Sequence, residues 1–186
     1  MVAAGQPLRV EPGGLPAYWE VMAANRRIPP LPGHFLGLAA TLSLAALGAC
    51  SPGAPKGVDK DQLDAAVSRA IGDPASCLLI AERASGKLVY RYNTHTACAR
   101  PLPACGGAND GGLQTIDQLL KATVKDGQAR MLSCSSTADA SRGVGWAAGP
   151  IPGKGLVYAA MMEGDRAFPG RMMADRLSRA FKDAGL

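Results

Sequence analysis

Residues 156–162 read Leu-Val-Tyr-Ala-Ala-Met-Met, and this run decides the fold that we expect. An uninterrupted apolar stretch of this length is typical of a strand that is covered on both faces. The strand should extend to residue 163. We therefore place it in the centre of a sheet, and we expect the flanking segments to supply its neighbours.

Four further segments have the patterns of strands. Residues 130–134 and 144–148 predict two strands, and a loop rich in proline and glycine at 149–153 joins the second to the central run. Residues 77–81 are continuously apolar, and residues 87–92 alternate apolar and polar side chains. These last two runs, with a Ser-Gly turn between them, predict an antiparallel hairpin.

Amphipathic segments at both ends and in the middle predict helices. Residues 61–71 repeat apolar side chains at helical spacing, with Asp59 or Asp61 as the N-terminal cap. Residues 115–125 open on a capping box, and a last helix follows Pro169. This order predicts an α+β domain in which the N- and C-terminal helices pack on an antiparallel sheet of about five strands.

The beginning of the chain has the layout of a bacterial export signal. Arg26 and Arg27 precede an uncharged run at 35–49, Phe-Leu-Gly-Leu-Ala-Ala-Thr-Leu-Ser-Leu-Ala-Ala-Leu-Gly-Ala, which is too short for a comfortable transmembrane helix. Leu-Gly-Ala-Cys at 47–50 resembles a bacterial lipobox, whose cysteine becomes the lipidated first residue of the mature protein. We therefore expect a lipid on Cys50. An ordinary signal peptide and a buried apolar helix are the alternatives.

These features divide the chain into three parts. Residues 1–49 are a leader and lipoprotein signal peptide, 50–58 are a lipidated tether rich in proline and glycine, and 59–186 are a single α+β domain. Translation starts at Met1 or at Met22, and the second gives a signal peptide of ordinary length. Since Ser51 rather than Asp follows the lipidated cysteine, the resemblance to lipoproteins implies anchoring at the outer membrane, facing the periplasm.

Four cysteines remain after Cys50 is assigned to lipid. An even number in an exported chain predicts two disulfides, with free buried thiols as the alternative. We favour a bridge between Cys98 and Cys105, which closes a small loop, and one between Cys77 and Cys134. The pairing of Cys77 with Cys98 and of Cys105 with Cys134 follows closely. Either pairing would restrain the loop that we expect from Asn93 to Gln114.

The composition argues against several classes of function. The net charge of +5 is spread along the chain without a basic stripe or a nucleic-acid-binding motif, so we expect no nucleic-acid partner. Two histidines and the lack of a C-x-x-C pair argue against a metal site. The glycine-rich loop at 149–155 lacks the spacing and the hydroxyl residue of a phosphate-binding loop, and we expect no cofactor.

Three residues form a candidate ligand surface: Trp146, Glu163 and Asp165. Trp146 has small neighbours and either lines a ligand surface or packs against the sheet. Glu163 and Asp165 are paired acids at the end of the central strand, where they either perform acid–base chemistry or are simply solvated. No G-x-S-x-G elbow occurs, and His95 has the sequence context of a solvated loop residue. We assign no catalytic residue.

Several segments resemble the serine β-lactamase and penicillin-binding transpeptidase family. They are Cys77–Asn93 (CLLIAERASGKLVYRYN), Cys98–Cys105, Gly143–Gly149 (GVGWAAG), Leu156–Asp165 (LVYAAMMEGD) and the helix after Phe-Pro-Gly-Arg. In that family the first hairpin and the last strands share one antiparallel sheet, and the terminal helices pack together on it. The resemblance therefore implies a β-lactamase-like domain.

The chain departs from this family where the chemistry should lie. Gly-Gly-Ala-Asn-Asp follows Cys105, where the family has its Ser-x-x-Lys nucleophile motif. Residues 133–138 read Ser-Cys-Ser-Ser-Thr-Ala, where the family has Lys-Thr-Gly. The large helical insert of the family does not fit between Cys105 and Arg130. These departures indicate a reduced relative that keeps the sheet and lacks the means for acyl transfer.

Two functional hypotheses follow. In the first, the protein is a non-catalytic cell-envelope lipoprotein, attached to the membrane through Cys50, that binds peptidoglycan or an envelope protein. In the second, it is a small serine hydrolase with a non-standard site. Such a site would use Ser133, Ser135 or Ser136 together with Glu163 or Asp165.

Overall fold

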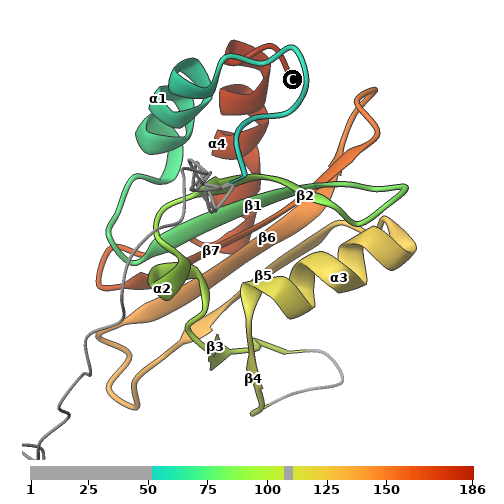
Figure 1. The fold of residues 1–186 in the computed structure, drawn as a ribbon. Helices are drawn as coiled ribbons and strands as arrows, with labels where there is room; N and C mark the ends of the chain where they lie inside the picture. Colours follow the sequence, from blue (N-terminus) through green and yellow to red (C-terminus); the bar gives the residue numbers. More distant parts are fainter. Residues whose placement is uncertain (1–51, 107–110) are drawn as a thin grey trace, which may run out of the picture. The chain divides into compact units, whose positions relative to one another are not determined.

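A computed structural model describes residues 52–106 and 111–186, whose arrangement is shown in Figure 1. The predicted signal peptide and Cys50 lie outside the described residues. The described elements, in chain order, are α1 (Lys60–Ile71), β1 (Ser76–Glu82), β2 (Leu88–Tyr92), α2 (His95–Cys98), β3 (Leu102–Pro103), β4 (Leu113–Gln114), α3 (Ile116–Asp126), β5 (Arg130–Ser135), β6 (Gly143–Ile151), β7 (Leu156–Gly164) and α4 (Gly170–Asp183).

The main sheet has five antiparallel strands in the order β2-β1-β7-β6-β5. Every residue of β7 is buried, and this strand lies in the centre as the apolar run at 156–162 predicts. The α+β class and the five-stranded antiparallel sheet are therefore confirmed. A second, two-stranded sheet joins β3 to β4.

The β6–β7 hairpin is longer than the sequence pattern indicates. Strand β6 continues through the proline- and glycine-rich segment to Ile151, and Pro150 pairs with Val157. Pro150 is tolerated because β5 no longer flanks β6 at this point: their pairing begins at Arg130 opposite Ala148. The missing N–H of a proline does little harm at such an edge position.

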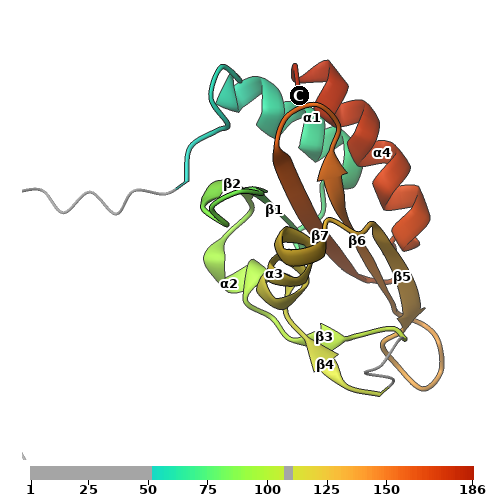
Figure 2. The ribbon, with the colours of Figure 1, turned by 90° about the vertical axis from the view of Figure 1, so that its right-hand side faces the viewer.

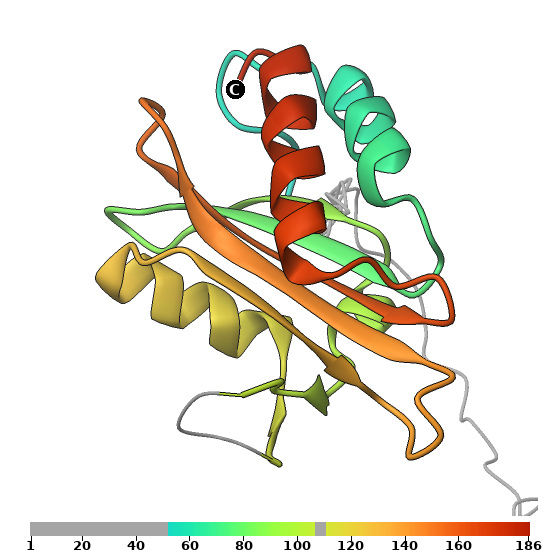
Figure 3. The same cartoon turned by 180° about the vertical axis from the view of Figure 1, so that it is seen from behind.

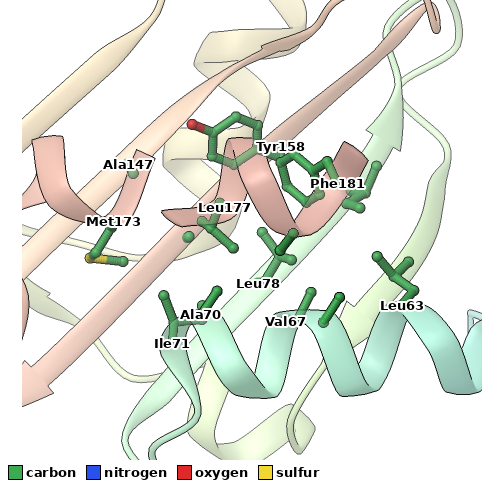
Figure 4. Close-up of a cluster of buried hydrophobic side chains, with 14 of the residues drawn as sticks. Leu63, Val67, Ala70, Ile71, Leu78, Ala147, Tyr158, Met173, Leu177 and Phe181 are labelled. Atoms are coloured by element: carbon green, nitrogen blue, oxygen red, sulfur yellow. The ribbon is translucent and has the colours of Figure 1, made fainter. Parts of the chain in front are cut away.

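Helices α1 and α4 lie together on one face of the sheet, as Figures 2 and 3 show. The Asp59 carboxylate caps α1 by accepting a hydrogen bond from the Gln62 N–H at 2.8 Å. Together the two helices and the sheet form a continuous apolar core, part of which is drawn in Figure 4. Its labelled members are Leu63, Val67, Ala70, Ile71, Leu78, Ala147, Tyr158, Met173, Leu177 and Phe181.

Helix α3 covers the opposite face and completes a second core (Figure 2). The predicted capping box is confirmed: the Thr115 side chain accepts a hydrogen bond from the Gln118 N–H, and the Gln118 side chain accepts one from the Thr115 N–H. The helix ends at Gly127, whose φ of 67° favours glycine. Both cores and both disulfides lie within the described residues.

The segment 93–114 is more regular than predicted. It contains the short helix α2 and the strands β3 and β4, and it runs across the α3 face of the sheet (Figure 1). One contact that holds it there is a hydrogen bond of 2.7 Å, which the Trp146 indole N–H donates to the Pro103 carbonyl. A side chain of the sheet thus supplies the anchor that the segment lacks in its own sequence.

The N-terminus of α4 packs against the sheet so closely that only glycine fits at two positions. A Cβ atom on Gly170 would lie closer than 3.0 Å to the backbone of Trp146 and Leu132. A Cβ atom on Gly145 would meet the Phe168 carbonyl oxygen in the same way. Backbone atoms cannot move aside as the end of a flexible side chain can, so these two glycines fix how near α4 lies to β5 and β6.

Among residues 52–106 and 111–186, no helix has the length and apolar character that crossing a membrane requires.

Candidate functional site

Two disulfides join the four cysteines that the sequence predicts to be paired. They link Cys77 with Cys98 and Cys105 with Cys134, with Cα atoms 5.3 and 5.1 Å apart. The prediction of two bridges is confirmed, and the favoured pairing is wrong. The alternative pairing is the one observed.

The strand order explains this pairing. Cys77 lies in β1 and Cys134 in β5, and both β7 and β6 separate these strands. Strands are about 4.8 Å apart, so the two positions are separated by roughly 14 Å. That distance is about twice the largest Cα separation that a disulfide spans. The segment from Cys98 to Cys105 instead crosses the sheet and is pinned at both ends.

Beside the second disulfide lies a buried carboxylate. In the sheet register, Cys134 pairs with Val144, and Val144 pairs with Glu163. Cys134 and Val144 belong to the core on the α3 face. Glu163 is only 8% exposed, and burying an isolated charge is costly, so this carboxylate requires partners.

Two arginines supply these partners. Arg142 donates from Nε to Oε1 at 2.9 Å and from Nη2 to Oε2 at 3.0 Å, while Arg100 donates from Nη2 to Oε2 at 2.7 Å. The hydrogen bonds from Arg142, helped by those from Arg100 and opposed by burial, lower the pKa of Glu163 to about 2. We call Arg100, Arg142 and Glu163 the Glu163 cluster.

The Glu163 cluster connects three parts of the chain that are distant in sequence. Arg100 follows α2, Arg142 lies in the turn between β5 and β6, and Glu163 lies near the end of β7. The arrangement ties the crossing segment and the turn to the central strand. Neither arginine stood out in the sequence. The one available signal was that a carboxylate at the end of a buried strand needs a cation nearby.

The structure brings together one serine–carboxylate pair of the hydrolase hypothesis. Ser136 donates a long hydrogen bond of 3.4 Å from Oγ to Glu163 Oε1. A carboxylate that already accepts three arginine hydrogen bonds, with a pKa near 2, is a weak general base at neutral pH. Glu163 is therefore poorly suited to take a proton from Ser136.

The other residues of that hypothesis do not join this pair. The Ser133 hydroxyl accepts a hydrogen bond of 2.9 Å from the Gly170 N–H, at the start of α4. Asp165 is exposed and forms no salt bridge with a described residue. Ser135 is exposed at the end of β5. His95, which does not belong to that hypothesis, is exposed at the first position of α2.

Trp146 packs in the interior of the domain. Its side chain is fully buried in the core on the α3 face, where the indole N–H bonds to Pro103. Of the candidate surface of Trp146, Glu163 and Asp165, the first two residues are buried and the third faces solvent. Of the two interpretations of Trp146, packing against the sheet is the one observed.

No group of three or more His, Cys, Asp or Glu side chains in the described part of the chain is arranged to hold a metal ion. Comparison of the chain with protein-family models, with curated proteins and with solved structures found no match.

Proposed function

We propose that this protein is a non-catalytic bacterial envelope lipoprotein, anchored through Cys50 to the outer membrane, that binds peptidoglycan or an envelope protein. We further propose that its domain is a reduced relative of the serine β-lactamase and penicillin-binding family. The sheet supports this relationship, because the first hairpin and the last strands share it, and α1 and α4 pack together on one face. Both are features that the resemblance implies.

The observation that carries the non-catalytic proposal is the disulfide between Cys105 and Cys134. In the family, the nucleophile motif would begin just after Cys105, and the Lys-Thr-Gly strand would occupy the position of β5, which holds Cys134. Here those two places are covalently joined, and neither carries a lysine. Acyl transfer in the family requires a nucleophilic serine, a lysine that activates it and a cation that binds the substrate carboxylate. The disulfide occupies the places where the family has these groups.

The outer strand of the sheet supports a binding role. Strand β5 is the last in the strand order, and Met131 in it is 45% exposed. An edge strand presents backbone N–H and C=O groups to which an extended peptide of a partner can bond. An exposed methionine adds apolar contact area for such a partner.

Two measurements test this function separately. The anchor is tested by growing cells that express the full chain with radiolabelled palmitate; label should enter the wild type and be absent from Cys50→Ala. Equal labelling of both, or none of either, would reject the anchor. The binding role is tested by sedimentation with purified peptidoglycan sacculi, and by cross-linking in whole cells followed by identification of the attached protein.

The hydrolase hypothesis remains as a second candidate because one observation favours it, the contact of Ser136 with Glu163. It requires Glu163 to accept a proton from Ser136 while two guanidinium groups hold the carboxylate ionised. We rank it second for that reason.

A further inference from the structure

We propose that the groove between α1 and α4 binds the phosphate groups of anionic phospholipids and so holds the domain against the membrane surface. This inference rests on the proposed function, because the lipid anchor brings the domain near a membrane. It adds a second, electrostatic contact that the anchor alone does not supply.

The groove consists of two adjoining cavities of about 460 and 370 Å³. Both are lined by Arg69 and Ala70 from α1 and by Arg176 from α4. Ala66 and Ala180 line the smaller of the two cavities, where their short side chains leave room for a headgroup.

The walls of the groove carry an excess of positive charge. Four arginines, Arg69, Arg166, Arg176 and Arg179, face two aspartates, Asp73 and Asp183. Arg166 is paired with Asp73 at 3.5 Å. Within residues 52–106 and 111–186, the other three arginines form no salt bridge. Guanidinium groups bind phosphate oxygens in a planar, two-point geometry, which makes phosphate a fitting ligand.

One of these arginines is held in place before any ligand arrives. The guanidinium of Arg176 stacks on the ring of Phe168, 4.2 Å from its centroid. Such stacking restricts a long side chain that would otherwise lose its freedom on binding. Arg176 therefore presents a fixed donor at the point where the two cavities meet.

The position of the tether favours a membrane as the source of phosphate. Pro52, the first described residue, lines a cavity together with Lys60 and Asp64 of α1. Val58 packs against the core under α1 and α4. That cavity also has Arg91 and Tyr92 of β2 in its lining, so the chain enters the domain beside α1, and the residues from Ser51 to Val58 span at most about 30 Å. A tether this short keeps the domain close to the membrane, so that α1 and α4 can contact the lipid headgroups.

The experiment uses the chain from Ser51 onward, which cannot be lipidated and contains both described cores. Binding is measured by sedimentation with vesicles of phosphatidylglycerol and phosphatidylethanolamine in equal amounts, and with vesicles of phosphatidylcholine. We expect binding to the anionic vesicles only, weakening as salt is raised. The triple variant Arg69→Gln, Arg176→Gln, Arg179→Gln should weaken it about tenfold or more.

A matched control removes the same charge from elsewhere in the domain. Lys87→Gln, Lys121→Gln and Lys125→Gln alter exposed lysines in the β1–β2 turn and in α3, away from the groove. This variant should keep its affinity within about threefold. Because Arg176 also packs on Phe168, the double variant Arg69→Gln, Arg179→Gln is included, and it should show an intermediate loss with an unchanged melting temperature.

Equal losses in the groove variant and in the control would overturn the inference, as would binding that ignores lipid charge. Preference for poly-glutamate over the vesicles would assign the groove to an acidic peptide and overturn the lipid assignment. Palmitate labelling of Cys50 without vesicle binding would leave the proposed function standing and reject the inference alone. Vesicle binding without labelling would reject the anchor instead.

Discussion

At the scale of single residues, Glu163 shows how a charge is accommodated at the end of a buried strand. The carboxylate is 8% exposed, yet its oxygens accept hydrogen bonds from two arginines on separate segments. These guanidinium groups are themselves 39% and 47% exposed, so water screens part of the attraction. The Glu163 cluster therefore matters more for positioning the three segments that it connects than for the net free energy of folding.

We expect Glu163→Gln to lower the free energy of unfolding by about 1–2 kcal/mol, because the arginines lose a charged acceptor and the amide bonds only partly. Urea unfolding at neutral pH measures this. Asp165→Asn, two residues away and exposed, is the control and should change little. A loss of similar size in both variants would mean that the Glu163 cluster is not the cause.

The same residue predicts a pH dependence. Its folded-state pKa of about 2 lies below the ordinary value of 4.5, so the folded state favours the ionised form. The stability advantage of wild type over Glu163→Gln should be complete above about pH 4.5 and should disappear as the pH falls toward about 2. Unfolding curves of both proteins across this range check the sign. An advantage that grows on acidification would contradict the assignment.

Gly170 is a second residue whose role follows from geometry. A methyl group there would press on the backbone of β5 and β6, and α4 would have to move away from the sheet. We expect Gly170→Ala to destabilise the domain by about 2 kcal/mol or more. Gly53→Ala, where a Cβ meets nothing within 4 Å, is the matched control. Thermal unfolding of the two variants side by side measures this, and equal losses in both would contradict the packing argument.

Residues such as these were the least predictable from sequence. Trp146 was compatible with a core or with a surface, and only its position opposite the crossing segment decides between them. Arg100 and Arg142 are ordinary polar residues in their local sequence. Their meeting at Glu163 depends on strand order, which local patterns do not specify.

At the scale of elements, the disulfides hold the segment between β2 and α3. Cys77–Cys98 fixes its start to β1, and Cys105–Cys134 fixes its middle to β5. Helical spacing predicted α1, α3 and α4, and apolar or alternating runs predicted the five strands of the main sheet, whereas α2, β3 and β4 were not predicted. The favoured Cys98–Cys105 bridge is wrong because cysteines that are close in sequence need not be close in space.

Each bridge should contribute about 3–4 kcal/mol by restricting the unfolded chain, since the sequence separations are 21 and 29 residues. The double variants Cys77→Ser, Cys98→Ser and Cys105→Ser, Cys134→Ser should therefore each lower the melting temperature clearly. Proteolysis without reductant, followed by mass spectrometry, should recover the linked peptides in these two pairs. Peptides joining Cys98 to Cys105 would contradict the structure.

At the scale of the whole domain, the fold is a sheet covered on both faces, with α1 and α4 on one side and α3 on the other (Figure 2). The apolar run of β7 predicted the central strand of the sheet, and the order of helices and strands predicted the α+β class. Function was less accessible, because the resemblance rests on the sheet while the family's catalytic motifs are missing from the sequence. At the two places that the proposed relationship assigns to these motifs, the chain has the two ends of the Cys105–Cys134 disulfide.

Our central proposal, that this domain performs no acyl transfer, is tested most directly by active-site labelling. The purified chain, with its disulfides intact, is incubated with a fluorescent penicillin and with a fluorophosphonate, and its intact mass is measured. We predict no adduct with either reagent, because two arginines hold the pKa of Glu163, the carboxylate beside Ser136, near 2, and the Ser133 hydroxyl accepts a hydrogen bond from the Gly170 N–H. A stoichiometric adduct on Ser133, Ser135 or Ser136 would contradict the account and establish the hydrolase in its place.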